Sequence, residues 1–335
     1  MTFLINAFKV VFLLGFLIFI HEGGHFLAAR LFKVKVEAFS IGFGPKIFTK
    51  KGKETEYSLG IIPFGGYVKM KGEEERSDET GSFSEAKVMH RIVIVAAGAF
   101  VNIVFAIIVF FFLSVFSGYN ISTTVSGKLP QAEANLSQVE VGDKLLKIND
   151  EKIRLKSDIS KALYNSNGEE VNVVLERAGE EVELKIKPTE YQEGVYVLGV
   201  QIALIDATVP EKIYYAFWET ISFVESMFDS LIMLLTGNIK IEQMTGPIGI
   251  SEIVVKSSGV YNFIYLLCLI SLSLGVTNLL PIPALDGGRI VLLIIEGIRG
   301  KALKEEIELG IQSVGFLLLI LLSLYVSYKD ILRIF

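Results

Sequence analysis

The chain has 335 residues, of which 51% are hydrophobic, and its mean hydropathy is +0.52. This composition excludes an ordinary soluble protein and indicates a membrane protein with room for one soluble domain. The net charge of −5 argues against nucleic acid as a main partner, and a single cysteine, Cys268, excludes an internal disulfide framework.

The first apolar segment, residues 3–31, predicts a membrane helix that carries a metal-binding pattern near its end. His21 and His25 are four residues apart and therefore share one helix face, so both imidazoles can reach one ion. Zinc suits two imidazoles plus an oxygen ligand, and Glu22 can act as general base toward the attacking water. A lone histidine in an apolar helix is usually a core residue, but two of the chain's three histidines at this spacing favour a metal site.

The N-terminal apolar run resembles a signal peptide, but it leads directly into the histidine pattern, so we interpret it as a retained helix. Basic residues follow that helix and predict that its end faces the cytoplasm, with the N-terminus outside. These residues are Arg30, Lys33, Lys35, Lys46, Lys50, Lys51 and Lys53.

Residues 34–71 alternate apolar and polar side chains and predict several short strands in a sheet at the membrane face. A turn at 51–53 indicates a hairpin. Four glycines in this region permit sharp bends or the close approach of another backbone, and we expect them near bound substrate. They are Gly42, Gly44, Gly65 and Gly66.

Residues 92–116 are uncharged and long enough to span the bilayer. Their strongly polar side chain, Asn102, is interpreted as a helix-to-helix hydrogen-bonding group. Residues 119–205 then mix charged and apolar residues and predict a compact α+β domain. Its Gly142-Asp143 pattern, followed by Leu145, Leu146 and Ile148, resembles a PDZ domain, although a glycine-rich carboxylate-binding loop is not clear.

Residues 209–237 are apolar but carry several charges, and they predict an amphipathic helix on the outer membrane face, with Tyr214, Tyr215 and Trp218 at the interface. Residues 245–249 predict a loop. The segment from 257 to 285 is again uncharged, and two prolines and two glycines within residues 278–289 break the helix and place Asp286 toward a protein interior. Residues 309–328 complete four predicted spans.

Both metal motifs together resemble the site-2 protease family of intramembrane zinc metalloproteases (peptidase family M50B), of the bacterial RseP type with a single PDZ domain. The resemblance rests on the His21–His25 motif, on residues 278–287 with the pattern N-x-x-P-x-x-x-x-D-G, and on the glycine-rich stretches 42–45 and 246–249. It covers essentially the whole chain.

This resemblance implies a Zn²⁺ ion held by His21, His25 and Asp286, with Glu22 as the catalytic base. It also implies that residues 34–71 meet the substrate, and that Asn278 holds the unwound chain. The implied function is regulated intramembrane proteolysis, the cleavage of transmembrane segments in single-span proteins such as anti-sigma factors or remnant signal peptides. The expected location is the bacterial inner membrane, with the active site near the cytoplasmic side.

The predicted fold class is a four-span α-helical membrane protein with a membrane-associated β-sheet and an inserted α+β PDZ domain. Its predicted parts are a first protease half (1–118), the PDZ-like domain outside the cytoplasm (119–206), an interfacial helix and loop (207–256) and a second half with two spans (257–335). Expected partners are the lipid bilayer and a peptide or substrate outer domain at the PDZ-like part. Two alternatives stay open: a membrane metal-ion transporter, and a PDZ-bearing scaffold with an inactive metal site.

Overall fold

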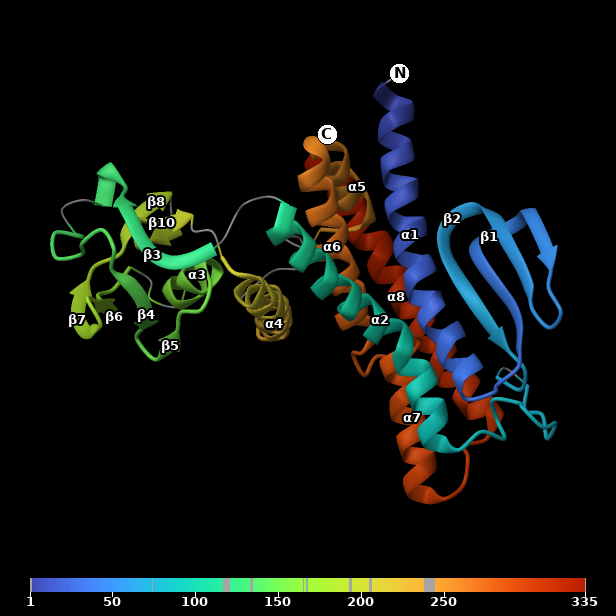
Figure 1. The fold of residues 1–335 in the computed structure, drawn as a ribbon. Coiled ribbons are helices and arrows are strands. Elements are labelled where there is room, and N and C mark those ends of the chain that lie inside the picture. The colour runs from blue at the N-terminus through green and yellow to red at the C-terminus, as the bar shows by residue number, and fades with distance from the viewer. Residues whose placement is uncertain are drawn as a thin grey trace. The chain divides into compact units, whose positions relative to one another are not determined.

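A computed structural model describes residues 2–334, apart from 74, 117–120, 133–134, 165, 167, 193–194, 205–206 and 238–244. The chain forms two compact units (Figure 1). Unit 1 contains residues 1–109 and 227–335, and unit 2 contains residues 110–226. The predicted boundaries of the PDZ-like domain, 119 and 206, lie outside the described residues.

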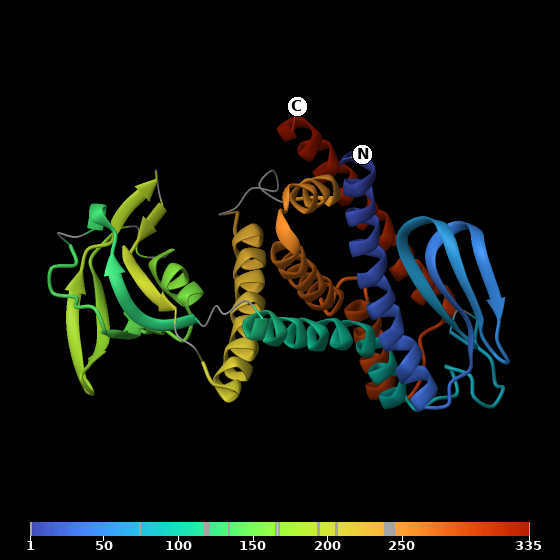
Figure 2. The ribbon, with the colours of Figure 1, turned by 45° about the horizontal axis from the view of Figure 1, so that its top comes forward.

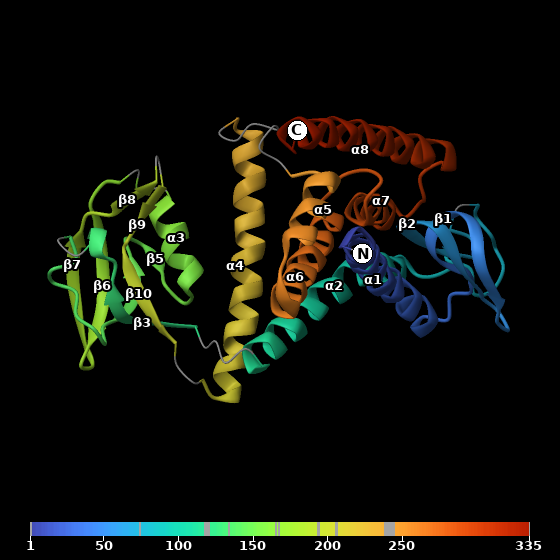
Figure 3. The same cartoon turned by 90° about the horizontal axis from the view of Figure 1, so that it is seen from above.

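Among the residues that the structure describes, four helices are long and apolar enough to cross a membrane, which confirms the predicted spans. They are α1 (Thr2–Leu31), α2 (Val88–Phe116), α6 (Gly259–Asn278) and α8 (Glu305–Ile334). Within unit 1, α1 lies between a β-hairpin and α6 (Figures 2 and 3). Leu13 and Leu17 of α1 are fully buried in a cluster with Leu267 of α6, so the predicted apolar helix also packs against protein.

The region after α1 forms two long strands, β1 (Val36–Lys51) and β2 (Glu56–Met70), where short strands were predicted. Glycines at 42, 44 and 65 adopt positive φ, so each strand bends without ending. Residues 38–41 therefore have partners at both 56–59 and 66–69, while 48–51 pair with 56–59. Residues 66–68 have ladder partners on one side only within the described chain, which makes them an outer row.

A short helix, α5 (Pro247–Lys256), replaces part of the loop predicted at 245–249. Proline is compatible with the first helical turn, and Gly246 precedes it as the N-cap. The buried carboxylate of Asp330 in α8 accepts the backbone N–H of Gly246 (3.3 Å) and of Gly249 (2.8 Å). A side chain distant in the sequence thus accepts hydrogen bonds from backbone amides at the start of α5, which have no partner within the helix itself.

A further helix, α7 (Asp286–Arg299), begins at the aspartate that follows the helix break. It ends at Gly300, whose φ of 64° is the left-handed conformation typical of a helix C-terminus. Its 14 residues are too few to span a bilayer. The helix break expected after Asn278 is therefore correct, but the chain forms a new helix before the last span.

Unit 2 contains an antiparallel sheet with strand order β10-β3-β4-β6-β7, in which β5 also pairs with β4, and a separate β8-β9 pair. The strands are β3 (Ile121–Lys128), β4 (Lys144–Ile148), β5 (Glu151–Lys152), β6 (Val171–Arg177), β7 (Glu180–Ile186), β8 (Thr189–Gln192), β9 (Val195–Val197) and β10 (Val200–Leu204). A 3-10 turn, η1 (Pro130–Ala132), and helix α3 (Lys156–Tyr164) complete the fold. The predicted hairpin of β6 and β7 turns at Ala178 and Gly179, both at positive φ.

The charge-bearing helix α4 (Val209–Leu235) forms as predicted, and its first part packs on unit 2. The guanidinium of Arg154 lies 4.0 Å from the Trp218 ring centre, and Lys161 pairs with Glu225 at 2.9 Å. Trp218 therefore contacts its own domain through a cation–π contact. Exposed hydrophobic side chains of the same helix include Ile213, Tyr214 and Phe217.

Candidate metal centre

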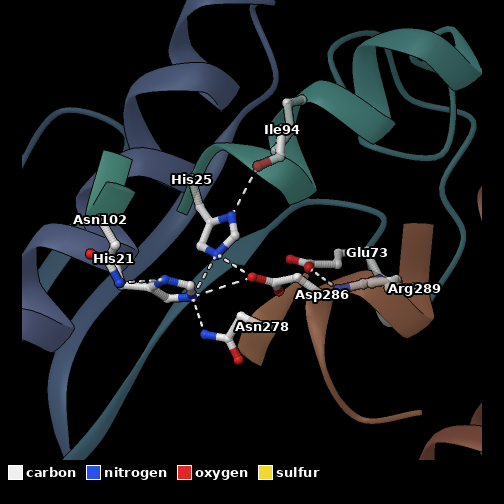
Figure 4. A network of polar contacts seen from close by, with 8 residues as sticks. All are labelled: His21, His25, Glu73, Ile94, Asn102, Asn278, Asp286 and Arg289. Atoms are coloured by element: carbon white, nitrogen blue, oxygen red, sulfur yellow. Dashed lines mark hydrogen bonds and ion pairs between the residues drawn. The ribbon is translucent and has the colours of Figure 1, made fainter. Parts of the chain in front are cut away.

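Three side chains from two distant parts of the sequence meet beside α1 (Figure 4). His21 and His25 point from one face of α1, and Asp286 comes from the start of α7. Asp286 Oδ2 lies 3.3 Å from His21 Nε2 and 3.5 Å from His25 Nε2, and the two Nε2 atoms are 3.3 Å apart. The three ligand atoms all lie within 4.8 Å of one another, which is the arrangement a single ion requires.

The hydrogen bonding of this group fits a cation. His25 Nδ1 donates to the carbonyl of Ile94 at 2.9 Å, so its Nε2 presents a lone pair to the cluster. Asp286 Oδ2 is buried and has no hydrogen-bond partner in the part of the chain that the structure describes. Lone pairs and an unpaired buried carboxylate oxygen repel one another unless a cation lies between them. Two imidazoles and one carboxylate are a donor set that suits zinc and leave a fourth position for water.

The break between α6 and α7 delivers Asp286 to this cluster. A Cβ at Gly287 would lie 2.2 Å from the carbonyl oxygen of Leu280, and a Cβ at Gly288 would lie 2.2 Å from that of Ile282. Residues 279–283 can therefore fold directly onto the first turn of α7 only because both positions are glycine. The two glycines after Asp286 are thus required by the close packing of the preceding loop against α7.

Helix α2 approaches the histidines very closely through small residues. A Cβ at Gly98 would lie 2.3 Å from His25 Nε2, and a Cβ at Gly24 would lie 2.5 Å from the Ala97 carbonyl oxygen. Any larger side chain at Gly98 would occupy the space of the imidazole. The short stretch of small residues in α2 is the signal that sequence reasoning missed, because it was interpreted only as part of an apolar span.

An ion pair links α7 to the segment that follows β2. Arg289, one turn after Asp286, pairs with the carboxylate of Glu73 and also donates to its backbone carbonyl at 3.3 Å. The Arg289 guanidinium lies 5.4 Å from the centre of the Phe83 ring, and Arg91 lies 5.9 Å from the same ring. Arg91 in turn pairs with Glu296 on α7.

These contacts bind α7 to two other parts of unit 1. Arg289 and Glu296 are seven residues apart and therefore project from the same side of α7. One contacts the segment after the hairpin, and the other contacts α2. The two contacts restrict rotation of α7 and so help to fix the direction of Asp286.

Two cavities of unit 1 share the Glu73–Arg289 pair as a wall. One of about 410 Å³ extends from Asp286 to Glu305 and Glu308 at the start of α8. The other, of about 470 Å³, lies over Tyr67 and Val68 of the outer row of β2 and over the adjacent Lys69. The pair therefore separates the hairpin side from the side that reaches the metal ligand.

Two further predicted residues lie close to the metal cluster. A Cβ at Gly66 would lie 2.7 Å from Ile18 Cγ2 and 3.1 Å from Glu22 Cγ, so the outer row of β2 packs directly on the Glu22 side of α1. Asn278, the last residue of α6, has its amide nitrogen 3.3 Å from His21 Nε2 (Figure 4). Gly66 thus packs against Glu22, and Asn278 contacts a predicted ligand directly.

The other three glycines predicted near substrate have local packing roles. Gly42 adopts a φ of 80° and lies so close to Ile62 that a Cβ would be 2.7 Å from its carbonyl oxygen. Gly65 adopts a φ of 91°, and a Cβ there would be 2.0 Å from the Phe43 ring. Gly44 adopts a φ of 81°, with ordinary contacts for a Cβ. All three allow the bent hairpin to form.

Comparison with known proteins agrees with this geometry. The family model of peptidase family M50 matches residues 9–322. A Clostridium perfringens protein named as a zinc metalloprotease is 37% identical over 320 residues, with 94% of this chain and 95% of the relative covered. A zinc metalloprotease relative from Fusobacterium nucleatum is 35% identical over 350 residues, with both chains covered at 100%. The regulator of sigma-W protease RasP of Bacillus subtilis is 28% identical over 419 residues, with 98% of each chain covered.

Membrane-length helices and the clustered histidines and aspartate, together with these relatives, define the class as a zinc metalloprotease embedded in the membrane. The chain belongs to peptidase family M50. It is a zinc-dependent intramembrane endopeptidase of the site-2 protease type, as the sequence motifs predicted. The transporter and scaffold alternatives are not favoured by these relatives.

Proposed function

We propose that His21, His25 and Asp286 hold the catalytic zinc ion and that Glu22 is the general base. The observation that carries this assignment is the convergence of three ligand atoms within 4.8 Å around an unpaired buried carboxylate oxygen. Without an ion, burying that oxygen would lower the stability of the protein, because no hydrogen bond offsets its loss of hydration. The Glu22 assignment rests on its place between the two ligands in the sequence motif.

In this assignment, bound zinc acts as a Lewis acid that lowers the pKa of the attacking water and polarises the scissile carbonyl. Glu22 accepts a proton from that water and later transfers it to the amine leaving group. The hairpin packs against the Glu22 side chain at Gly66, where a Cβ would lie 3.1 Å from Glu22 Cγ. His21 and His25 keep the site rigid, because both belong to one helix packed on α2.

We further propose that the outer row of β2, residues 66–68, pairs with an unwound segment of substrate. Its free side belongs to a strand that packs on α1 next to Glu22, as the close contact of Gly66 indicates. An unwound peptide in the membrane needs partners for its backbone N–H and C=O groups, and an unpaired strand edge supplies them. Asn278 lies beside the cluster, 3.3 Å from His21 Nε2, and in this proposal its amide hydrogen-bonds the same peptide. The bends at Gly42, Gly44 and Gly65 set the shape of this edge.

The proposed substrates are single-span proteins of the bacterial inner membrane, such as anti-sigma factors or remnant signal peptides. The basic residues after α1 support an active site near the cytoplasmic side, with the N-terminus and unit 2 outside. We propose that the sheet of unit 2 is a PDZ domain that either binds an outer peptide or excludes substrates with bulky outer domains. Its open antiparallel sheet and helix α3 support this class, and the exposed apolar side of α4 suits the membrane surface.

Co-expression with candidate single-span proteins tests the assignment. Glu22→Gln should keep the zinc content of the purified protein and reduce cleavage by about 10²–10⁴-fold. Glu181→Gln, an exposed change on β7, is the matched control and should cleave like the wild type. Near-normal cleavage by Glu22→Gln would exclude Glu22 as the base, and full zinc content in His21→Ala would exclude the ligand set.

The role of unit 2 needs a separate experiment. Replacing residues 121–204 by a short flexible linker should leave zinc bound and allow cleavage of substrates with large outer domains that the intact protein rejects. A deletion variant that binds zinc but still discriminates by outer-domain size would argue against exclusion. A variant that no longer cleaves trimmed substrates would indicate that unit 2 recruits them.

A further inference from the structure

Three residues of α2, spaced four apart, line the side of the metal cluster away from the substrate edge. Ile94 accepts the Nδ1–H of His25, and Gly98 leaves room for the same ring. Asn102, one turn further on, places its amide nitrogen 3.3 Å from His21 Nδ1 (Figure 4). Each histidine therefore has one α2 group behind its Nδ1 atom.

The two histidines differ in how their ring protons are fixed. Ile94 offers a carbonyl oxygen, which can only accept, so His25 must carry its proton on Nδ1 and present Nε2 to the metal. Asn102 offers an amide, which can donate from nitrogen or accept with oxygen. As it stands, the nitrogen faces His21 Nδ1, which makes Nδ1 the acceptor and assigns the His21 ring proton to Nε2, the atom that a zinc ligand must have free.

The amide oxygen of Asn102 points to an alternative orientation. Asn102 is fully buried, and its amide oxygen has no hydrogen-bond partner among the residues described here. A half-turn of the amide exchanges its oxygen and nitrogen without changing its shape. The oxygen would then face His21 Nδ1, accept its proton and free Nε2 for metal ligation.

Helix α6 holds Asn102 in place for this exchange. The Ser271 hydroxyl donates to the backbone carbonyl of Asn102 at 3.1 Å. Gly275 lies so close that a Cβ there would be 3.2 Å from Asn102 Cβ. The side chain therefore sits on a fixed backbone, and only its terminal amide has to rotate. A neutral amide also adds no charge beside Glu22 and Asp286, whereas an ionised side chain would.

We propose that Asn102 is the positioning residue of His21: its amide oxygen accepts the Nδ1–H and so fixes Nε2 as the zinc ligand. The inference rests on the proposed ligand set and adds a residue to it that contacts a ligand without contacting the metal. Groups that orient a metal-binding histidine in this way typically change metal affinity about 10–100-fold when they are removed.

Zinc affinity of the full-length protein, measured by competition with a chelator in detergent, tests the proposal. Asn102→Ala should weaken zinc binding about 10–100-fold, and Asn102→Asp, which keeps an acceptor oxygen, should bind zinc within a few-fold of wild type. Replacing zinc by cobalt gives a second readout, because the absorption bands of Co²⁺ report the ligand geometry. We expect a changed cobalt spectrum for Asn102→Ala only.

Asn262→Ala is the matched control, since this asparagine of α6 donates to Ser258 on its own helix at 2.9 Å. It should leave zinc affinity unchanged. Unaltered zinc affinity and an unaltered cobalt spectrum in Asn102→Ala would overturn the proposal, as would an Asn102→Asp variant as weak as Asn102→Ala. If Asn102→Ala does not fold, weak zinc binding by folded Asn102→Asp is sufficient to overturn it.

His21→Ala separates this proposal from the ligand assignment. Weak zinc binding in His21→Ala with normal binding in Asn102→Ala would overturn only the role of Asn102. Normal zinc binding in His21→Ala would instead overturn the ligand set on which the proposed function rests.

Discussion

Buried carboxylates in the two units differ in whether their oxygens have partners. In unit 2, the side chain of Asp143 is 1% exposed and accepts two hydrogen bonds from Arg177, at 2.8 and 2.7 Å, and one from the Glu140 backbone at 2.8 Å. In unit 1, Asp286 has a buried oxygen with no hydrogen-bond partner among the described residues, facing two histidine nitrogens. Both are acids in the protein interior, but only the first has the contacts that stabilise a fold.

This difference distinguishes a structural acid from a functional one. A carboxylate with all its oxygens paired holds chain segments together, and Asp330 in unit 1 is a second case, with two backbone amides and Arg333 around it. A carboxylate left unpaired inside the protein lowers stability unless a ligand completes it. Variants of these acids should therefore separate loss of zinc from loss of folding.

The largest effect is expected from Asp286→Ala. Removing the third ligand should lower zinc content to near zero and abolish cleavage, while the helices of unit 1 stay folded because the lost oxygen made no structural hydrogen bond. Zinc analysis of the purified variant, together with circular dichroism, checks this result. Full zinc occupancy with normal turnover would place Asp286 among the structural acids.

A smaller loss of activity is expected from Arg289→Leu. It leaves the half-buried Glu73 unpaired and removes one of the contacts that fix α7, so the direction of Asp286 becomes less defined. Zinc affinity should fall about 10–100-fold, in the range seen for groups that support metal ligands. A combined Glu73→Leu and Arg289→Leu variant should recover part of the affinity, because no unpaired charge remains. Equal zinc affinity in wild type and Arg289→Leu would show that Arg91 and Glu296 are sufficient to hold α7.

Asp143→Asn should act on folding alone. The substitution keeps the size of the side chain but removes the charge that Arg177 contacts, and we expect unit 2 to lose about 1.5–3 kcal/mol of stability. Amide hydrogen exchange at the buried residues Leu145 and Leu175 measures this loss in the full-length protein. Zinc content should match the wild type, and any loss of zinc would contradict the separation of the two kinds of acid.

The smallest effect is a pH dependence of the same pair. The Arg177 hydrogen bonds hold the pKa of Asp143 below its ordinary value. A lowered folded-state pKa adds stability that is complete above the unfolded pKa of about 4 and is lost as pH falls through the folded value. Hydrogen exchange in unit 2 should therefore accelerate below about pH 4 in the wild type, after correction for intrinsic rates. Asp143→Asn should show a flatter profile, and identical profiles would exclude this pair as the cause.

Several features of the protein follow from the sequence alone. Long uncharged segments fix the four membrane helices, because burying charges in hydrocarbon is costly. The spacing of His21 and His25 fixes a shared helix face, since the period of an α-helix is local. The pairing of Asp286 with these histidines was predicted from the motif after the helix break, and in unit 1 the three side chains do meet.

Tertiary structure alone decided the rest, because those features depend on contacts between distant residues. The bent two-strand hairpin depends on glycines with positive φ. Glycine is also typical of turns, so the sequence does not distinguish a bend within a strand from the end of a strand. The contact of Trp218 with Arg154 joins residues far apart in the sequence, so only the packed domain decides it. Asn102 was correctly interpreted as a helix-to-helix hydrogen-bonding group, but its partner, 81 positions away, is a histidine of the metal cluster. Hydrophobic periodicity specifies which residues are buried, whereas the partner of a buried polar group is specified only when the helices pack.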